Sequence, residues 1–196
     1  MSGVRRIAAI CASLLAAAAG VVFAEPVPGD PRFAKSQEIV ARFHGELSGR
    51  LKEAMGTGGP AHAIDVCSRD APAIAARLSA ESGAFVGRVA AAVRNPANAA
   101  DTEERETLEK FRREIAAGAA ETPVAFDVAA DGSATFMKAI VTQPACLACH
   151  GTALAPEVAS AVARQYPEDR ATGFAAGDLR GAFVVRWPGD PAERAP

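Results

Sequence analysis

The sequence lacks any run of basic residues. Its 196 residues include 21 Lys and Arg against 23 Asp and Glu, which gives a formal net charge of −2. Proteins that bind nucleic acid through its phosphates carry clustered positive charge. We therefore expect no nucleic-acid partner.

Internal repeats and low-complexity tracts are also missing from the sequence. This absence and the length of the chain favour one domain that is large enough to bury a core. We place this domain at residues 33–190, between a flexible Pro- and Gly-rich leader at 25–32 and a tail at 191–196. No kinase or cyclase sequence follows the domain, so any regulatory output is expected to pass through another protein.

The long hydrophobic run of the sequence lies at its N-terminus. Arg5 and Arg6 precede a stretch of small and apolar residues from 7 to 24, and an acidic residue ends it. This order is typical of a secretory signal peptide at residues 1–24, cleaved after Ala24, and it predicts a periplasmic protein whose mature chain has no membrane span. An uncleaved anchor is the alternative, but the run is near the lower length limit for a span and is rich in weakly hydrophobic alanine.

Cysteine is scarce, with four residues in the whole chain. Cys11 would leave with the signal peptide, so Cys67, Cys146 and Cys149 remain, an odd number for an exported protein. Zinc usually takes four ligands, often from two separated pairs, and this sequence has one pair. A thioredoxin-like pair would begin a helix after a strand, whereas a loop at Gly151 follows this pair. A structural disulfide is the simplest alternative.

The pair stands in the order Cys146-Leu147-Ala148-Cys149-His150, which matches the attachment signature of c-type haem. Two thiols at this spacing reach the two vinyl groups of the porphyrin, and the histidine that follows ligates the iron. The predicted export agrees, because bacteria attach this haem outside the cytoplasm. We predict one covalently bound haem c per chain, with Cys146 and Cys149 as attachment residues and His150 as the proximal ligand.

Hydrophobic spacing predicts the elements around this motif. It predicts a helix over 33–55, a stop at the glycines of 56–59, and a second helix from Pro60 to Ser82 that kinks or breaks at Pro72. The remaining elements are a strand over 85–93, a loop over 94–98, a helix from Asp101 or Thr102, a β-hairpin over 124–141, a helix near Pro156 and a strand over 182–187. Together they predict an α+β domain around an antiparallel sheet.

Five residues are candidates for the second axial ligand of the iron. They are Cys67, Met55, Met137, His44 and His62. Both methionines fit core stripes, where methionine usually packs, and both histidines fit exposed positions on their helices. Cys67 lies on the apolar face of its helix, where a free cysteine often packs as a small hydrophobic residue. The odd number of cysteines favours Cys67 modestly, and these patterns alone leave the choice open.

Four segments of the chain resemble a known family. They are "AIDVCSRDAPAIA" (63–75), "RNPANAAD" (94–101), "CLACHG" (146–151) and "YPEDRATGFAAGDLRGAFVV" (166–185), in this order and at fitting separations. They are similar to a family of single-haem c-type cytochromes, formerly a domain-of-unknown-function family, whose type member is a cyanobacterial haem protein. The resemblance covers most of the chain that follows the signal peptide.

The resemblance implies a PAS-like fold, with a central antiparallel sheet flanked by helices. It also implies that a cysteine thiolate, which corresponds to Cys67, ligates the iron opposite His150. Three arginines, Arg88, Arg94 and Arg180, are candidates for bidentate contacts with the haem propionates. Ordinary solvated arginines are the alternative for each of them.

This ligation leads to a function. A thiolate stabilises ferric iron, so we expect a low-potential, one-electron redox protein with an unknown redox partner, and not an enzyme. The alternative is a periplasmic sensor of redox state or of a gas such as NO or CO, which acts through a separate partner. A peroxidase-like enzyme would need an open ferric site and a distal acid-base residue such as His62, and it is the weakest of the three interpretations.

Overall fold

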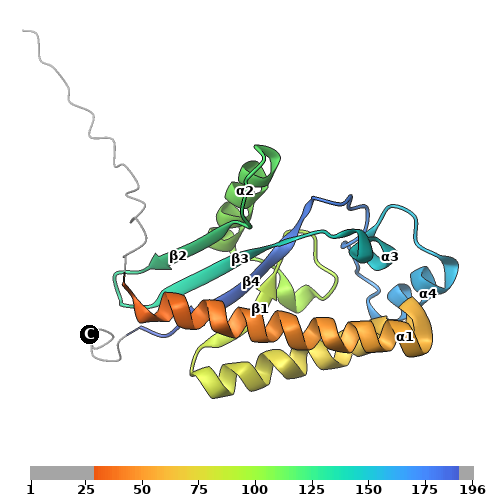
Figure 1. Ribbon diagram of the computed structural model, residues 1–196, viewed down its shortest axis with the longest axis horizontal. Coiled ribbons are helices and arrows are strands. Elements are labelled where there is room, and N and C mark those ends of the chain that lie inside the picture. The colour runs from red at the N-terminus through yellow and green to blue at the C-terminus, as the bar shows by residue number, and fades with distance from the viewer. Residues whose placement is uncertain (1–28, 190–196) are drawn as a thin grey trace, which may run out of the picture.

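The computed structural model describes residues 29–189, and these residues form one antiparallel sheet flanked by helices (Figure 1). The sheet has the strand order β1-β4-β3-β2. Its strands are β1 (Phe85–Val89), β2 (Val124–Val128), β3 (Ala134–Val141) and β4 (Leu179–Trp187). The helices are α1 (Pro31–Ser82), α2 (Thr102–Ala116), α3 (Leu147–His150) and α4 (Pro156–Gln165). The α+β fold with a flanked antiparallel sheet is therefore confirmed.

The long helix α1 is a hairpin of two arms. Gly59 interrupts it with φ 72° and ψ −173°, a combination that essentially only glycine adopts. We call residues 31–58 the first arm and residues 60–82 the second arm. In Figure 1 the second arm runs back beside the first. The predicted stop among the glycines and the restart at Pro60 are confirmed, with the reversal placed at Gly59.

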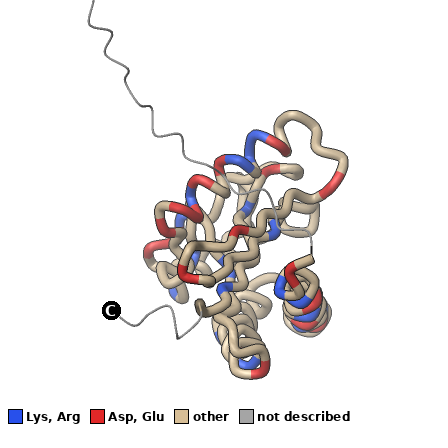
Figure 2. Tube along the Cα trace, turned by 90° about the vertical axis from the view of Figure 1, so that its left-hand side faces the viewer, with Lys and Arg blue, Asp and Glu red and all other residues tan. Residues whose placement is uncertain are grey.

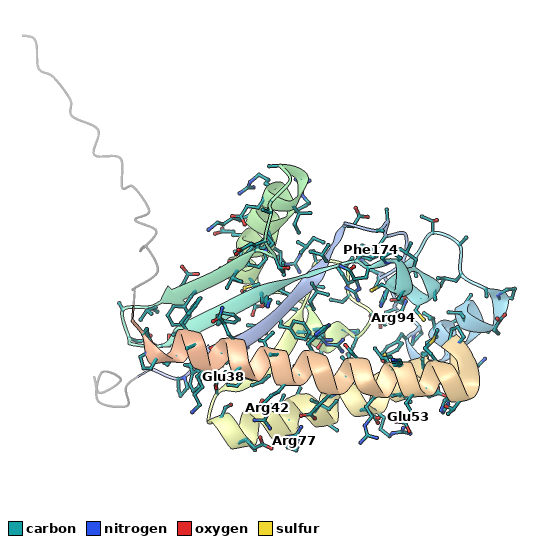
Figure 3. All side chains as sticks on the ribbon, in the orientation of Figure 1. Glu38, Arg42, Glu53, Arg77, Arg94 and Phe174 are labelled. Carbon is teal, nitrogen blue, oxygen red and sulfur yellow. The ribbon has the colours of Figure 1, made fainter. Side chains whose placement is uncertain are left out.

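Ion pairs join the two arms of α1 across the hairpin. The guanidinium of Arg42 lies 2.7 Å from the carboxylate of Glu81, and Arg77 pairs with Glu46. Arg77 also pairs with Glu81 within the second arm. Figure 3 labels Arg42 and Arg77 where the arms face each other. These pairs are exposed, so each adds little to stability, but together they favour one register of the arms.

Each face of the sheet has its own core. On one face, Phe43 of α1 packs with Phe136 and Val185, and on the other face Phe111 of α2 packs with Val184. Val184 and Val185 are neighbours in β4, and successive residues of a strand point to opposite faces. Both are fully buried, so helices cover β4 on its two sides.

The predicted start of α2 is confirmed by its cap. The carboxylate of Asp101 accepts the N–H of Glu104, and the carboxylate of Glu104 accepts the N–H of Asp101. Glu104 also pairs with Arg186 of β4 at 2.9 Å. The cap therefore ties the beginning of α2 to the sheet.

Two helix predictions were wrong in detail. The second arm does not break at Pro72, because Gly59 is where the backbone leaves the helical region. Ala71 and Ile74 are buried on either side of Pro72, and their packing holds this turn in place. Met55 was expected in the core but is 39% exposed, since the core stripe of the first arm ends before it.

The strand predicted over 85–93 is shorter in the structure. β1 ends at Val89, and Ala90 pairs instead with Ala99 in an isolated parallel bridge. The rest of the segment becomes loop because the chain must turn toward α2. This loop carries Arg94, whose side chain reaches the carbonyl of Cys149.

The ends of the chain fall outside the described residues. The predicted signal peptide and the tail at 191–196 belong to these ends, whereas α1 already begins at Pro31 within the predicted leader. Among residues 29–189, no helix has the length and apolar character needed to cross a membrane. In Figure 2, acidic and basic residues alternate along the helices and do not separate by sign.

Gly59→Ala should lower the free energy of unfolding by about 1–3 kcal/mol, because alanine is strained in this backbone conformation. Gly45→Ala is the matched control, since it adds the same methyl group within the first arm. Neither methyl group would meet another atom within 4 Å. The control should stabilise the protein by up to about 1 kcal/mol, through helix propensity alone. Denaturant unfolding of both variants measures this difference, and equal effects would contradict the assignment of the reversal to Gly59.

Candidate functional site

The C-x-x-C-H motif lies beyond the end of β3. A single 3-10 turn, Pro144–Cys146, connects the strand to α3, which contains the rest of the motif. The backbone of Thr142 anchors this connection by accepting the N–H of Gly177 and donating to the carbonyl of Asp178, both at 2.8 Å. Figure 1 shows α3 next to α4, near the end where α1 reverses.

The imidazole of His150 is held by one hydrogen bond. Its Nδ1 donates to the carbonyl oxygen of Ala171 at 2.6 Å, which requires the proton on Nδ1 and leaves Nε2 as the free acceptor. Burial, and then the nearby charges of Arg180 and Arg94, lower the pKa of His150 to about 4. The ring is therefore neutral at physiological pH, in the tautomer that suits a metal ligand through Nε2.

Arg94 connects the motif to the loop that carries Ala171. Its Nη2 donates to the carbonyl of Cys149 at 2.6 Å, while Nε and Nη2 reach the two carboxylate oxygens of Asp169 at 3.1 and 3.2 Å. The side chains of Arg94 and Asp169 are only 11% and 8% exposed. Figure 3 shows Arg94 and Phe174 beside α3. Arg94 is thus engaged by protein groups, and its predicted contact with a propionate stays a prediction.

Cys67 comes to the motif from the second arm of α1. Burial raises the pKa of its thiol, the charges of Arg88 and Arg94 act in the opposite direction, and Cys149 is close enough to raise the pKa further. Cys149 is partly buried and packs against a cluster made of Ile64, one turn before Cys67, and buried residues of α4. Two cysteines from distant parts of the sequence therefore share one region.

The other candidates for the second ligand lie elsewhere. Met137 is buried against α2, and Met55 is exposed. His44 is exposed on the first arm, where its ring lies 5.9 Å from that of Phe183. His62 is exposed and lines a small hollow between the arms together with Arg50 and other polar residues. The structure thus gives each of these four residues a place in packing or on the surface.

Arg88 and Arg180 have unused hydrogen-bonding capacity. Within residues 29–189 the guanidinium of Arg88 has no hydrogen-bond partner, and its carbon lies 5.8 Å from the centre of the Phe43 ring. Arg180 donates through Nη1 to the carbonyl of Ala92 at 3.1 Å, but its buried Nε has no partner among the described residues. Burial lowers the pKa of both arginines, that of Arg180 to about 10. A carboxylate would satisfy both guanidinium groups.

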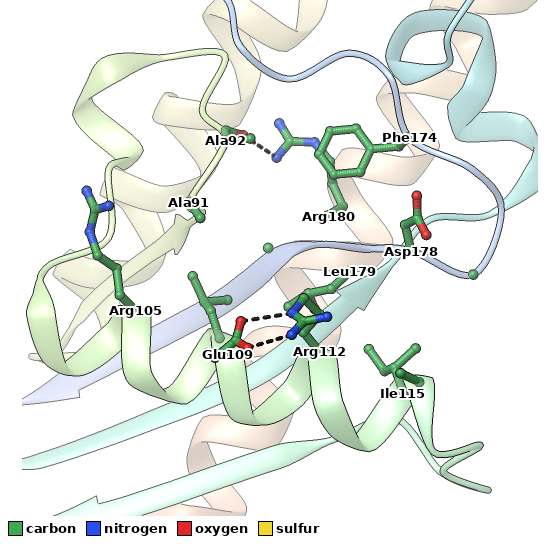
Figure 4. Close-up of a pocket in the computed structure, with 14 residues that line it drawn as sticks. Ala91, Ala92, Arg105, Glu109, Arg112, Ile115, Phe174, Asp178, Leu179 and Arg180 are labelled. Carbon is green, nitrogen blue, oxygen red and sulfur yellow. Dashed lines mark hydrogen bonds and ion pairs between the residues drawn. The ribbon is translucent and has the colours of Figure 1, made fainter.

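A cavity of about 560 Å³ adjoins this region, between α2 and the beginning of β4. Arg180 and Phe174 form one wall, and Leu108 and Ile115 of α2 form another (Figure 4). The carbon of the Arg180 guanidinium lies 5.4 Å over the Phe174 ring, whose centre is 6.4 Å from that of His150. The cavity is therefore separated from the motif histidine by these two side chains.

The chemistry of the donor groups fits a haem. Cys67, Cys146 and Cys149 are all free thiols, His150 offers a neutral Nε2, and the half-buried Arg180 has a buried Nε without a partner among the described residues. These are the groups that vinyl carbons, iron and propionates require. In the described part of the chain, no three His, Cys, Asp or Glu residues are grouped so that they could hold a bare metal ion.

Sequence reasoning missed three residues of the site. Asp169 pairs with Arg94, Phe174 packs against His150, and the pKa of Tyr166 responds to Cys67. All three lie in the segment from 166 to 185 that carried the family resemblance. Arg180 was the residue of this segment with a predicted role. Asp169 had none, because a carboxylate 75 positions from its partner arginine leaves no local pattern.

Comparison with known proteins identifies a family and a similar solved structure. The model of the Tll0287-like family matches residues 23–188. The crystal structure of the cyanobacterial haem protein Tll0287 is similar with a TM-score of 0.64 and 27% sequence identity, over 82% of this chain and 97% of that chain. A search of curated proteins finds no match.

The Cys67 thiol should react slowly with iodoacetamide in the folded, haem-free protein, because burial raises its pKa and the thiolate is the reactive form. The rate should increase as the pH rises above 9.0, the ordinary value of a cysteine. Peptide mapping by mass spectrometry measures each cysteine separately, and the urea-unfolded chain is the control. Equal rates for Cys67 in the folded and unfolded chain would contradict its burial.

Proposed function

Since this chain belongs to the Tll0287-like family, we propose that it is a haem-binding protein whose C-x-x-C-H motif carries one covalently attached haem c. Tll0287 itself is a haem protein, and the structural match extends over nearly all of that chain. The thiols of Cys146 and Cys149 would form the two thioether bonds, and Nε2 of His150 would ligate the iron. The hydrogen bond from His150 to Ala171 supports this role, because it leaves Nε2 free.

The second axial ligand in this proposal is the thiolate of Cys67. The observation that carries it is the placement of Cys67 near Cys149: Cys149 packs against a buried cluster that includes Ile64, one turn before Cys67, and the two thiols are close enough for their charges to interact. When bound, the haem supplies an iron that exchanges one electron and favours the thiolate form of a ligating cysteine. Arg88 and Arg94 also favour a negative charge on Cys67, against the effect of burial.

Arg88 and Arg180 are the residues proposed to bind the haem propionates. Both are partly buried cations whose pKa is lowered by burial, and the buried Nε of Arg180 has no partner among the described residues. Each would gain a charge-assisted hydrogen bond from a carboxylate. Without an anion, these two positive charges would be costly to bury. Their placement near Cys67 and His150 is therefore consistent with a ligand that brings negative charge into the site.

With these ligands the protein would be a low-potential, one-electron redox protein of the periplasm, and not an enzyme. The thiolate neutralises part of the charge on oxidised iron, which stabilises the ferric state relative to a methionine ligand. The predicted signal peptide supports the periplasmic location.

A redox or gas sensor is the second candidate function. One observation favours it: burial raises the pKa of Cys67, so the cysteine has a tendency to take up a proton once the iron no longer holds it as a thiolate. Reduction of the iron would weaken that hold. A displaced Cys67 would open a position for CO or NO, and its movement on α1 would be the signal read by a separate partner.

The ferric protein should give a low-spin EPR spectrum with the narrow g-spread typical of thiolate ligation. Cys67→Ser should abolish this signal, because the serine hydroxyl is not an anionic ligand at neutral pH. The controls are His62→Ala and Met137→Leu, which should leave the spectrum unchanged. A wide g-spread that survives in Cys67→Ser would move the second ligand to another residue and end the proposal for Cys67.

Titration of the reduced protein with CO separates the two candidate functions. A carrier should retain Cys67 on the iron and bind CO only weakly, whereas Cys67→Ala should bind it readily. A sensor should bind CO at low concentration with an optical spectrum like that of Cys67→Ala. The measurement compares the optical spectra of wild type and Cys67→Ala at the same CO concentrations. Similar spectra at low CO indicate a sensor, and different spectra indicate a carrier.

A further inference from the structure

Arg94 and Asp169 form a buried ion pair next to His150 that the proposed ligand set does not use. We infer that this pair is a positioning device, which holds the Ala171 carbonyl against the imidazole and thereby tunes the proximal ligand of the iron. The inference rests on the proposed function, since it assigns His150 to the iron. It gives Arg94 a role apart from the propionate contact predicted from the sequence, which stays a prediction.

The hydrogen bonds converge on the peptide groups of Ala171. One carboxylate oxygen of Asp169 accepts the Ala171 N–H at 2.9 Å, and the Ala171 carbonyl accepts the His150 Nδ1–H at 2.6 Å. Asp169 thus fixes the backbone whose carbonyl orients the ring. A hydrogen bond at the second nitrogen of a ligating histidine sets its tautomer and raises its basicity.

Arg94 closes the arrangement from the other side. It pairs with Asp169 through two nitrogens and donates to the carbonyl of Cys149, the residue before His150. The planar guanidinium fixes the distance between these groups, which a lysine could not do. The same loop is held further along, where the N–H of Phe174 donates to the carbonyl of His150 at 3.0 Å.

Stability alone does not explain such a pair. A buried ion pair costs about as much in desolvation as it gains in attraction, so its presence points to specificity of structure. The pair between Glu109 and Arg112 on α2 offers the contrast: its side chains are about half exposed, and it contacts no residue of the motif in the described structure.

The charges of the pair also act on the histidine in opposite directions. The cation of Arg94 and the anion of Asp169 lie 3.1 Å apart, so their effects on a charge at the iron site partly offset each other. Removal of the Asp169 charge would leave the cation of Arg94 uncompensated beside the iron site. Positive charge disfavours the oxidised centre, and the reduction potential should therefore rise.

The test uses the purified holoprotein and three variants. Asp169→Asn keeps the size of the side chain but removes its charge. Arg94→Lys keeps the positive charge but removes the planar guanidinium that makes two parallel hydrogen bonds. Glu109→Gln is the control at an exposed ion pair. Asp169→Asn should change the ferric-to-ferrous ratio at fixed potential by about tenfold, a positive shift of about 59 mV for one electron. Arg94→Lys should shift the EPR g-values with a smaller change of potential, and Glu109→Gln should resemble the wild type.

Three results would overturn the inference. The first is a wild-type potential and spectrum in both Asp169→Asn and Arg94→Lys. The second is an equal shift in Glu109→Gln, which would indicate a general effect of net charge. The third needs no variant: NMR should show a His150 Nδ1 proton that exchanges slowly with solvent in the wild type, and rapid exchange would rule out a held carbonyl. If the variants do not fold, this NMR measurement on the wild type tests whether the Ala171 carbonyl holds His150.

Failure of the proposed function has a different signature. A wild-type protein without covalently bound haem would contradict that proposal directly, before any variant is compared. Unchanged variants in a haem-loaded protein would contradict the positioning role alone.

Discussion

The reversal of α1 at Gly59 is the constraint on which the candidate site depends. The first arm covers one face of the sheet and runs toward the end where α3 lies, and the second arm returns from that end. Cys67 lies two turns into the returning arm, next to the region that the C-x-x-C-H motif enters from β3. A straight helix of the same sequence would carry Cys67 away from the sheet. The left-handed conformation of one glycine therefore determines which cysteine can approach the motif.

A second constraint is the imbalance of buried charge. Arg88, Arg94 and Arg180 meet near the motif, and their charges interact with one another. Among the described residues, Asp169 is the carboxylate that is hydrogen-bonded to one of them, and it serves Arg94. In this part of the chain, two cations are thus left beside the motif without an anion. The two propionates of a haem would balance them, and a thiolate at Cys67 would then balance part of the charge on ferric iron.

The sequence predicted most of the fold, because local rules decide most of it. The cap at Asp101, the glycine that ends α1 at Gly83 and the hairpin between β2 and β3 each depend on residues close together in the chain. Prediction failed where packing overrides a local preference. Pro72 is a helix breaker by chemistry, yet its buried neighbours keep the turn helical.

In the candidate site too, residues that follow a local pattern could be predicted, and residues that distant segments bring together could not. A five-residue motif was enough to indicate Cys146, Cys149 and His150, since haem attachment needs them at a fixed spacing. Cys67 required the family resemblance, because its distance from the motif is set by the fold. Asp169 could not be predicted from the sequence at all. Its significance arises from the hydrogen bonds to Arg94 and Ala171, which exist only once distant loops have come together.

Burial of the site disfavours the thiolate form of Cys67, which is the form that would ligate iron. A thiolate in an apolar region is unfavourable, and Arg88 and Arg94 compensate for this only in part. An anion bound to Arg88 would weaken this compensation, so in the proposed site propionate binding and thiolate stability would compete for the same positive charge. Arg94 is already paired with Asp169 and is therefore less free to bind such an anion. The effect of Arg94 on the Cys67 thiolate would then stay the same, whether or not propionates bind Arg88 and Arg180. This division of roles among three arginines would let one site hold an anionic cofactor and an anionic ligand at once.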